Sequence, residues 1–218
     1  LLFLDCDSEI LAPDFLSKYI EVLDKLKPQV IYGGSVYQGN RPLKDFRLRW
    51  KISTMKESKS FKERNSNFNW GFKTNNFIIE KKVLQQVPFN EELKGYGHED
   101  TLFAFDISKA NISITQSDNS VLNAHLDTNN VYLKKTNEAL ANLVDVLKIL
   151  KYDKEFIKQI PLLKTYFLLK NKGFLLFLKP FFWCIKSPLH SCLKSGTFFV
   201  WMFDLYKLIE FSRIHTVK

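Results

Sequence analysis

The feature that most constrains this chain is a change in its pattern near residue 127. Up to residue 126, short apolar runs alternate with segments whose apolar residues recur at helical spacing. This alternation of strand and helix predicts an α/β fold built in layers. After that point only helical patterns follow. We therefore expect one domain over residues 1–135 and a helical region over residues 136–218.

The individual elements are predicted from periodicity and from the residues that start or end each run. We expect strands at residues 1–4, 30–37, 75–79, 112–115 and 120–126. We expect helices at residues 15–26, 81–87, 98–109, about 136–150, and 155–170 with a break at Pro161. Residues 38–74 are interpreted as a long, partly helical excursion. The first strand is expected to be buried. Thr136 or Asn137 is expected to cap the helix at about residues 136–150.

The charges are unevenly distributed between the two parts. Residues 1–128 hold 17 Lys and Arg against 17 Asp and Glu, whereas residues 129–218 hold 15 against 6 and carry the whole net charge of +9. In the first part, the basic stretch 41–64 is interpreted as a solvated helix face. A neutral first part and a basic, aromatic second part indicate two different tasks.

The helical region contains two very apolar stretches, Phe174–Ile185 and Phe198–Phe211. Both are too short or too interrupted by charges to span a bilayer. Their aromatic residues and scattered lysines favour helices that lie on an anionic membrane surface. Packing against the first domain, or in a dimer interface, is the alternative. Nucleic acid is not expected as a partner, because the lysines are interleaved with aliphatic runs.

The cysteines and the first residues bear on the location of the chain. Three cysteines without a C-x-x-C pair favour a reducing, cytoplasmic compartment over a disulfide scaffold. Together with the apolar stretches, this predicts a cytoplasmic protein that is peripheral at the membrane. The chain opens on an apolar run at Leu1 without a Met, so we expect a fragment that begins inside a strand.

A first candidate site is Asp5-Cys6-Asp7, directly after the apolar run 1–4. Two carboxylates two residues apart, at the point where a strand becomes a loop, are able to share a divalent cation that also bridges a diphosphate. A plain turn with an aspartate as a helix cap is the alternative.

A second candidate site is Gly95-Tyr96-Gly97-His98-Glu99-Asp100, at the start of a predicted helix. A turn that sets adjacent carboxylates at a helix N-terminus holds one of them ready as a general base. Capping of the helix by Glu99 and Asp100 is the alternative. Capping alone does not require an aromatic residue between two glycines.

Taken in order, these motifs resemble the family 2 inverting glycosyltransferases of the GT-A fold. The family pattern is an apolar strand ending in Asp-x-Asp, and later Gly-Trp/Tyr-Gly-x-Glu-Asp. The segments 74–79 and 89–91 also look like that family's approach to its Glu-Asp motif. The resemblance covers about residues 1–135. It implies a partial GT-A (Rossmann-like) layer fold, followed here by a C-terminal helical region.

The resemblance also implies roles for individual residues. Asp100 would be the general base that deprotonates the acceptor hydroxyl, with Glu99 beside the acceptor. Asp7 would ligate Mn²⁺ or Mg²⁺, and Asp5 would touch the metal or the ribose of the donor. The other implied residues are Tyr96 and Asn76 on the acceptor side, and His125 as a third metal ligand. An ordinary hydrogen bond at a strand end is the alternative for His125.

The implied function is inverting transfer of a sugar from a nucleotide-sugar donor to a hydroxyl of a glycan or lipid-linked acceptor, in surface polysaccharide or glycolipid assembly. The family's first strands, which hold the nucleotide base, have no counterpart in residues 1–218, so we expect weak donor binding. Two alternatives stay open. One is a catalytically inactive scaffold at the membrane surface. The other is a haloacid-dehalogenase-type phosphatase with Asp5 as nucleophile, from whose pattern Glu9 departs.

Overall fold

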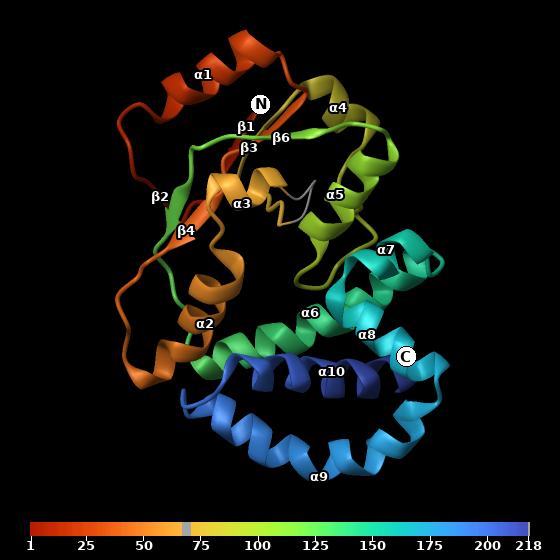
Figure 1. Ribbon diagram of the computed structural model, residues 1–218. Helices are drawn as coiled ribbons and strands as arrows, with labels where there is room; N and C mark the ends of the chain where they lie inside the picture. The colour runs from red at the N-terminus through yellow and green to blue at the C-terminus, as the bar shows by residue number, and fades with distance from the viewer. Residues whose placement is uncertain (67–70, 218) are drawn as a thin grey trace. The chain divides into compact units, whose positions relative to one another are not determined.

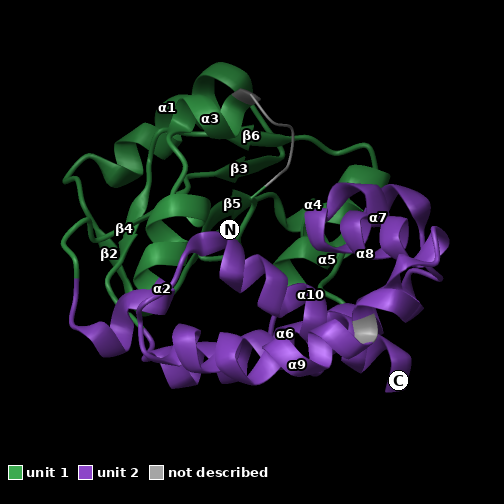
Figure 2. Cartoon of the chain, turned by 60° about the horizontal axis from the view of Figure 1, so that its bottom comes forward, with its two compact units in different colours: residues 1–41, 50–91, 99–126 green, residues 42–49, 92–98, 127–218 purple. Residues whose placement is uncertain are grey.

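The computed structural model describes residues 1–66 and 71–217. The fold is mixed α/β, with 59% of it helical and with two small mixed sheets (Figure 1). The chain forms two compact units, shown in Figure 2. Unit 1 consists of residues 1–41, 50–91 and 99–126, and unit 2 of residues 42–49, 92–98 and 127–218. Two short segments of the strand-bearing part of the sequence therefore belong with the C-terminal helices.

All seven described strands lie in unit 1. They are β1 (Leu2–Leu4), β2 (Ser8–Ile10), β3 (Val30–Tyr32), β4 (Ser35–Tyr37), β5 (Asn76–Ile79), β6 (Ile114–Gln116) and β7 (Val121–Asn123). One sheet has the order β1-β5-β3-β6, and the other has the order β2-β7-β4. The single strand expected at residues 30–37 is thus two strands in two sheets. Gly33 and Gly34 separate them.

Strand directions bring three strand ends to one edge of the larger sheet. Strand β5 is antiparallel to both β1 and β3, and β3 is parallel to β6. Strands β1, β3 and β6 therefore point the same way, and their carboxyl ends share an edge. Asp5 follows β1 and Gly33 follows β3 at this edge, where Asn76 begins β5. The carboxyl ends of strands are the usual place for ligands in α/β sheets.

Strand β1 differs from the expectation of a buried strand. Among the described strands it pairs with β5 alone, and Leu2 and Leu4 keep 42% and 38% of their surface exposed. Phe3, on the other face, stacks on Phe77 with ring centroids 4.8 Å apart. The expectation was wrong for the two leucines because an apolar run does not distinguish an edge strand from a central one.

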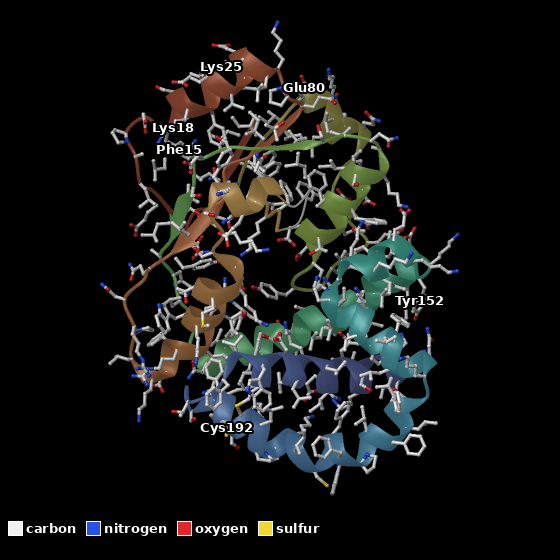
Figure 3. All side chains as sticks on the ribbon, in the orientation of Figure 1. Phe15, Lys18, Lys25, Glu80, Tyr152 and Cys192 are labelled. Carbon is white, nitrogen blue, oxygen red and sulfur yellow. The ribbon has the colours of Figure 1, made fainter. Side chains whose placement is uncertain are left out.

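Helices α1 (Phe15–Leu26), α4 (Lys81–Gln86) and α5 (Glu99–Lys109) complete unit 1 close to their expected bounds. The apolar stripe of α1 is narrower than its sequence indicates. Phe15 and Tyr19 are buried, whereas Leu16 and Ile20 are more than half exposed. Figure 3 labels Phe15 at the start of this helix and two of its lysines. Helix α5 buries Phe103 and Ile107 in the main core cluster with residues of β3, β5 and β6.

The excursion at residues 38–74 is partly helical, as expected, although residues 67–70 lie outside the described part. It contains a 3₁₀ turn η1 (Lys44–Phe46), α2 (Arg47–Ile52), a π-helical turn η2 (Ser53–Glu57) and α3 (Phe61–Ser66). The solvated face expected for this basic stretch is wrong for Arg64, which is buried. Its guanidinium donates to the carbonyls of Tyr32 (3.4 Å), Gly33 (2.9 Å) and Ser117 (2.9 Å). Arg64 thus satisfies backbone acceptors where β3 and β6 end.

Five helices form most of unit 2. They are α6 (Asn129–Ile149), α7 (Lys154–Gln159), α8 (Pro161–Asn171), α9 (Phe174–Lys194) and α10 (Val200–Val217). The expected break at Pro161 is confirmed, because α8 begins there. The expected cap of α6 is wrong. Thr128 caps it by accepting the Val131 N–H (3.4 Å), and Thr136 lies inside the helix, where its hydroxyl bonds the Tyr132 carbonyl (2.7 Å).

The two apolar stretches of the sequence become α9 and α10, which pack against each other and against α6 (Figure 1). Helix α10 buries the large residues Phe203, Tyr206, Ile209 and Phe211, so it is a core helix of unit 2. In the part of the chain that the structure describes, no helix is both long and apolar enough to cross a membrane.

Candidate active site

Three carboxylates come together in unit 1 from positions far apart in the sequence. Asp5 and Asp7 lie in the exposed turn after β1, where the Asp5 N–H donates to the Asn75 carbonyl (3.0 Å). Asp100 lies in the first turn of α5. Partial burial raises the pKa of Asp5, and the nearby carboxylates of Asp7 and Asp100 raise it further. Mutual repulsion of this kind favours binding of a cation or a proton.

Asp100, like Asp5, has a raised pKa. Burial raises its pKa, and the nearby carboxylate of Glu57 adds to the rise. The Lys73 ammonium and the bonds from Thr101 oppose this shift without cancelling it. The backbone N–H and hydroxyl of Thr101 donate to Asp100 Oδ1 at 2.7 and 3.2 Å. A carboxylate with a raised pKa is a better general base than an ordinary aspartate.

A partly buried group of three residues, Tyr37, Glu57 and Lys73, lies near Asp100, and no sequence pattern indicated it. The Lys73 Nζ atom donates to Glu57 Oε2 (2.7 Å) and to the hydroxyl of Tyr37 (3.1 Å), and that hydroxyl donates to Glu57 (3.0 Å). Burial by itself lowers the pKa of Lys73, but Glu57 and Tyr37 outweigh it, so the net pKa is raised. Lys73 therefore stays a cation beside the carboxylates. Its partner Glu57 lies in the 38–74 stretch, for which the sequence has no clean period, and Tyr37 ends the strand expected at residues 30–37.

Asn75 and Asn76 have different roles in the structure. Asn76 is fully buried, and its amide is occupied: Oδ1 accepts the Tyr19 hydroxyl (2.6 Å), while Nδ2 donates to the carbonyls of Gly34 (2.9 Å) and Asn119 (2.8 Å). These bonds connect α1, the start of β5 and two loops, which is a structural role. The resemblance to the glycosyltransferase family had implied a place for Asn76 on the acceptor side.

Asn75 is a residue that the sequence analysis missed. Among the described residues its buried Oδ1 has no hydrogen-bond partner, and the same holds for the Ser8 hydroxyl. Both residues flank the Asp5 turn, since the Ser8 N–H donates to the Asp5 carbonyl (3.1 Å). An unpaired buried oxygen costs about 1–3 kcal/mol. Adjacent side chains at a strand start point to opposite faces, and this could have suggested that only one asparagine is structural.

The turn before Asp100 belongs to unit 2 and is held there by α6. The Asn142 Nδ2 atom donates to the carbonyls of Gly95 and Gly97. A Cβ atom at Gly95 would lie 2.6 Å from Asn142 Oδ1, and one at Gly97 would lie 2.7 Å from Ala139 Cβ. Gly97 also has a φ of +88°. Close packing therefore requires both glycines of the motif.

Of the other motif residues, Cys6, Tyr96 and Glu99 are exposed and His98 is half-buried. Tyr96 keeps 52% of its surface accessible, and the Lys135 Nζ atom lies 5.6 Å from its ring centroid. Lys135 also bonds Asp127 at 2.8 Å. Glu99 is exposed in the first turn of α5.

The metal ligands expected from the sequence are not preassembled. Within residues 1–66 and 71–217, no group of three or more His, Cys, Asp or Glu side chains is arranged to hold a metal ion. His125 is exposed in the loop after β7. The oxygen atoms near the Asp5 turn are nonetheless of the hard type that Mg²⁺ and Mn²⁺ take. They come from Asp5, Asp7 and Asn75.

Comparisons of the chain with protein-family models, with curated proteins and with solved structures found no match. The functional assignment therefore depends on the residues of the chain and on their arrangement.

Proposed function

We propose that this chain carries the catalytic carboxylates of an inverting glycosyltransferase, which moves a sugar from a nucleotide-sugar donor to an acceptor hydroxyl. One observation carries the proposal: Asp5, two residues before Asp7, lies close enough to Asp100, about 95 residues later in the sequence, for the Asp100 carboxylate to raise the pKa of Asp5. The carboxylates Asp5, Asp7 and Asp100 of the two motifs thus lie in one unit. The finer assignment to a partial GT-A fold is part of this proposal.

In the proposed reaction, Asp100 removes the proton of the acceptor hydroxyl. The hydroxyl oxygen attacks the anomeric carbon of the donor sugar, and the bond from that carbon to the nucleoside diphosphate breaks in the same step. A partly buried carboxylate with a raised pKa suits this task, because proton removal depends on the basicity of the group. The single displacement leaves no covalent intermediate on the protein.

A divalent cation at Asp5 and Asp7 fits the donor set. Their mutual repulsion and the unpaired Oδ1 of Asn75 are both relieved by a hard cation with oxygen ligands. When bound, Mn²⁺ or Mg²⁺ would take up charge on the departing diphosphate. On the acceptor side, the exposed Tyr96 and Glu99 keep the roles that the resemblance implies, and a glycan or lipid-linked hydroxyl stays the proposed acceptor. A cytoplasmic location is also part of the proposal.

The proposal is tested by separating metal binding from transfer. We predict that Mn²⁺, followed by electron paramagnetic resonance, binds the native chain and that Asp7→Asn loses this binding. Asp100→Asn should still bind Mn²⁺. With a panel of nucleoside diphosphate sugars at millimolar concentration, Asp100→Asn should release the nucleoside diphosphate on the order of 100-fold more slowly than the native chain.

Asp24→Asn, an exposed change on α1, is the matched control and should alter neither readout. Native turnover in Asp100→Asn, or turnover that chelation with EDTA leaves unchanged, would exclude the proposed roles. Label retained on Asp5 after incubation with a phosphate ester would favour the phosphatase alternative. Mn²⁺ binding without any turnover would favour the inactive scaffold.

A further inference from the structure

Helix α9 has two faces that are both apolar. Its inward face buries Leu175, Phe182, Leu189 and Leu193, which recur at seven- and four-residue spacing against α10, α6 and α8. Such spacing fills one stripe of a helix. That stripe accounts for the packing of α9 in unit 2, so the remaining apolar residues of this helix have another explanation.

The opposite face carries large apolar side chains that the described residues leave uncovered. We call this set the outer face of α9: Phe174 (51% exposed), Leu176 (72%), Phe177 (79%), Phe181 (54%) and Trp183 (82%). Single exposed apolar residues are common on protein surfaces, but a contiguous set marks an interaction surface. Phe199 and Trp201 are similarly exposed where the chain enters α10.

Two prolines shape this helix. Pro180 and Pro188 lie inside α9, and both are exposed on the side away from its partners. A proline removes one helical hydrogen bond and bends the helix. Figure 1 shows α9 curving along α10, and Figure 3 shows Cys192 among the side chains near its C-terminal end. The bent helix thus keeps its inner stripe on its neighbours and presents the outer face along its length.

The stretch of sequence that contains α9 carries charges of one sign. From Phe156 to Phe203 the sequence has seven lysines and no Asp or Glu. Lys170 and Lys172 are exposed before the first turn of α9, and Lys194 is exposed at its last turn. Lys186 is instead drawn inward to the buried Glu210 (2.8 Å), which Arg213 also contacts (2.9 Å). The acidic group next to α9 is therefore already neutralised within unit 2.

We propose that the outer face of α9 binds the surface of an anionic lipid bilayer, with the aromatic side chains in the interface and the lysines at both ends near the headgroups. A second copy of the chain fits less well, because a two-fold contact through this face would bring the same lysines together. An acidic lipid surface pairs with them, and aromatic residues are favoured at the depth of the headgroups. The inference is independent of the proposed transfer reaction, since α9 lies in unit 2.

The test is co-sedimentation of the full chain with vesicles of phosphatidylcholine, with and without about one-third phosphatidylglycerol. We expect binding to the anionic vesicles that about 0.5 M NaCl weakens but does not abolish. Phe177→Ser/Trp183→Ser should weaken binding on the order of 100-fold, because two large side chains no longer enter the interface. Lys172→Glu should weaken it more than fivefold, since removing one lysine charge costs about that factor.

Leu16→Ser/Ile20→Ser is the control, because it removes two exposed apolar residues from α1 and should leave vesicle binding unchanged. Circular dichroism checks that each variant keeps its helices. A folded native chain that does not sediment with anionic vesicles overturns the proposal. Equal loss in the control and in the α9 variant also overturns it. So does a concentration-dependent dimer that Phe177→Ser/Trp183→Ser dissociates and that binds no vesicles.

Discussion

At the scale of single residues, the candidate site combines features visible in the sequence with others that are not. The acidic motifs around Asp5 and Asp100 were found by their spacing and by the elements before and after them. The group formed by Tyr37, Glu57 and Lys73 was not, because no pattern relates these positions. Burial decides the basicity of Asp100, and burial depends on everything that packs around it.

The raised pKa of Asp100 gives a prediction about stability. A carboxyl group whose pKa is higher in the folded than in the unfolded chain destabilises the fold once it ionises. Its contribution is favourable below the unfolded pKa of about 3.9 and is lost as the pH rises through the folded pKa. Asp100→Asn should therefore be more stable than the native chain at pH ~7, because the asparagine has no charge to lose solvation on folding.

Thermal unfolding between about pH 3 and pH 8 measures this difference. We expect the melting temperatures of Asp100→Asn and the native chain to converge below about pH 4, where both side chains are neutral. A variant that is less stable than the native chain at neutral pH would contradict the raised pKa. If Asp100→Asn is more stable than the native chain but no longer transfers sugar, the aspartate serves function at a cost in stability.

The glycines of the Gly-Tyr-Gly turn make a second prediction at this scale. Gly97→Ala places a methyl group 2.7 Å from Ala139 Cβ at a φ of +88°. We expect a loss of about 2–4 kcal/mol in the free energy of unfolding, from strain and overpacking together. Chemical denaturation of the variant measures the loss.

Two other glycines allow the effect of backbone strain to be separated from the effect of overpacking. Gly173 also has a positive φ of +74° but has open space around it, so Gly173→Ala should show the cost of strain alone, about 1 kcal/mol. Gly39 has open space and no positive φ, so Gly39→Ala should be neutral or slightly stabilising. Equal effects at Gly97 and Gly173 would mean that the contact with Ala139 carries no energy.

At the scale of elements, unit 2 is joined by one polar residue at the start of α6. Asn129 is buried. Its Oδ1 accepts the Leu48 N–H (2.8 Å), and its Nδ2 donates to the carbonyls of Lys44 and Lys194 (both 2.9 Å). One amide thus connects the 42–49 segment, α6 and the end of α9. No pattern in the sequence distinguishes this asparagine from its neighbours.

Asn129→Ala should leave three buried backbone groups without partners and lower the free energy of unfolding by about 2–4 kcal/mol. Asn129→Asp keeps the acceptor for the Leu48 N–H but loses both donated bonds, so it should also lower the free energy of unfolding. This loss should depend on pH, because the new carboxyl group titrates. Asn130→Ala, at an exposed neighbouring position, is the control and should change little. Urea unfolding followed by circular dichroism compares the three, and a loss at Asn130 equal to that at Asn129 would contradict the assignment.

At the scale of the whole molecule, the two units of the structure differ from the two parts that the charge distribution and the sequence pattern indicate. Segments 42–49 and 92–98, which precede the change of pattern in the sequence, belong to unit 2. Helix α6 begins at Asn129, so the expected boundary at residue 135 lies inside it. Neither unit is a continuous stretch of chain, and only the contacts between distant segments define them.

The two apolar stretches show that composition alone does not predict whether a helix is buried. Their sequences look alike, yet α10 is buried among its neighbours and α9 presents an apolar face outward. Both were expected at a membrane surface on the same argument. The structure assigns Phe203 and Phe211 to the core and leaves Phe177 and Trp183 exposed, and this difference depends on which neighbours each helix meets.

The sequence by itself determined the type and approximate position of most elements, the break at Pro161 and the location of the acidic motifs. Those features depend on nearby residues, through periodicity, helix breakers and strand ends. The tertiary structure alone decided that β1 is an edge strand, that Asn75 and not Asn76 has an unpaired oxygen, and that Lys73 lies beside Asp100. Each of these depends on which distant segments pack together, and local patterns do not encode that choice.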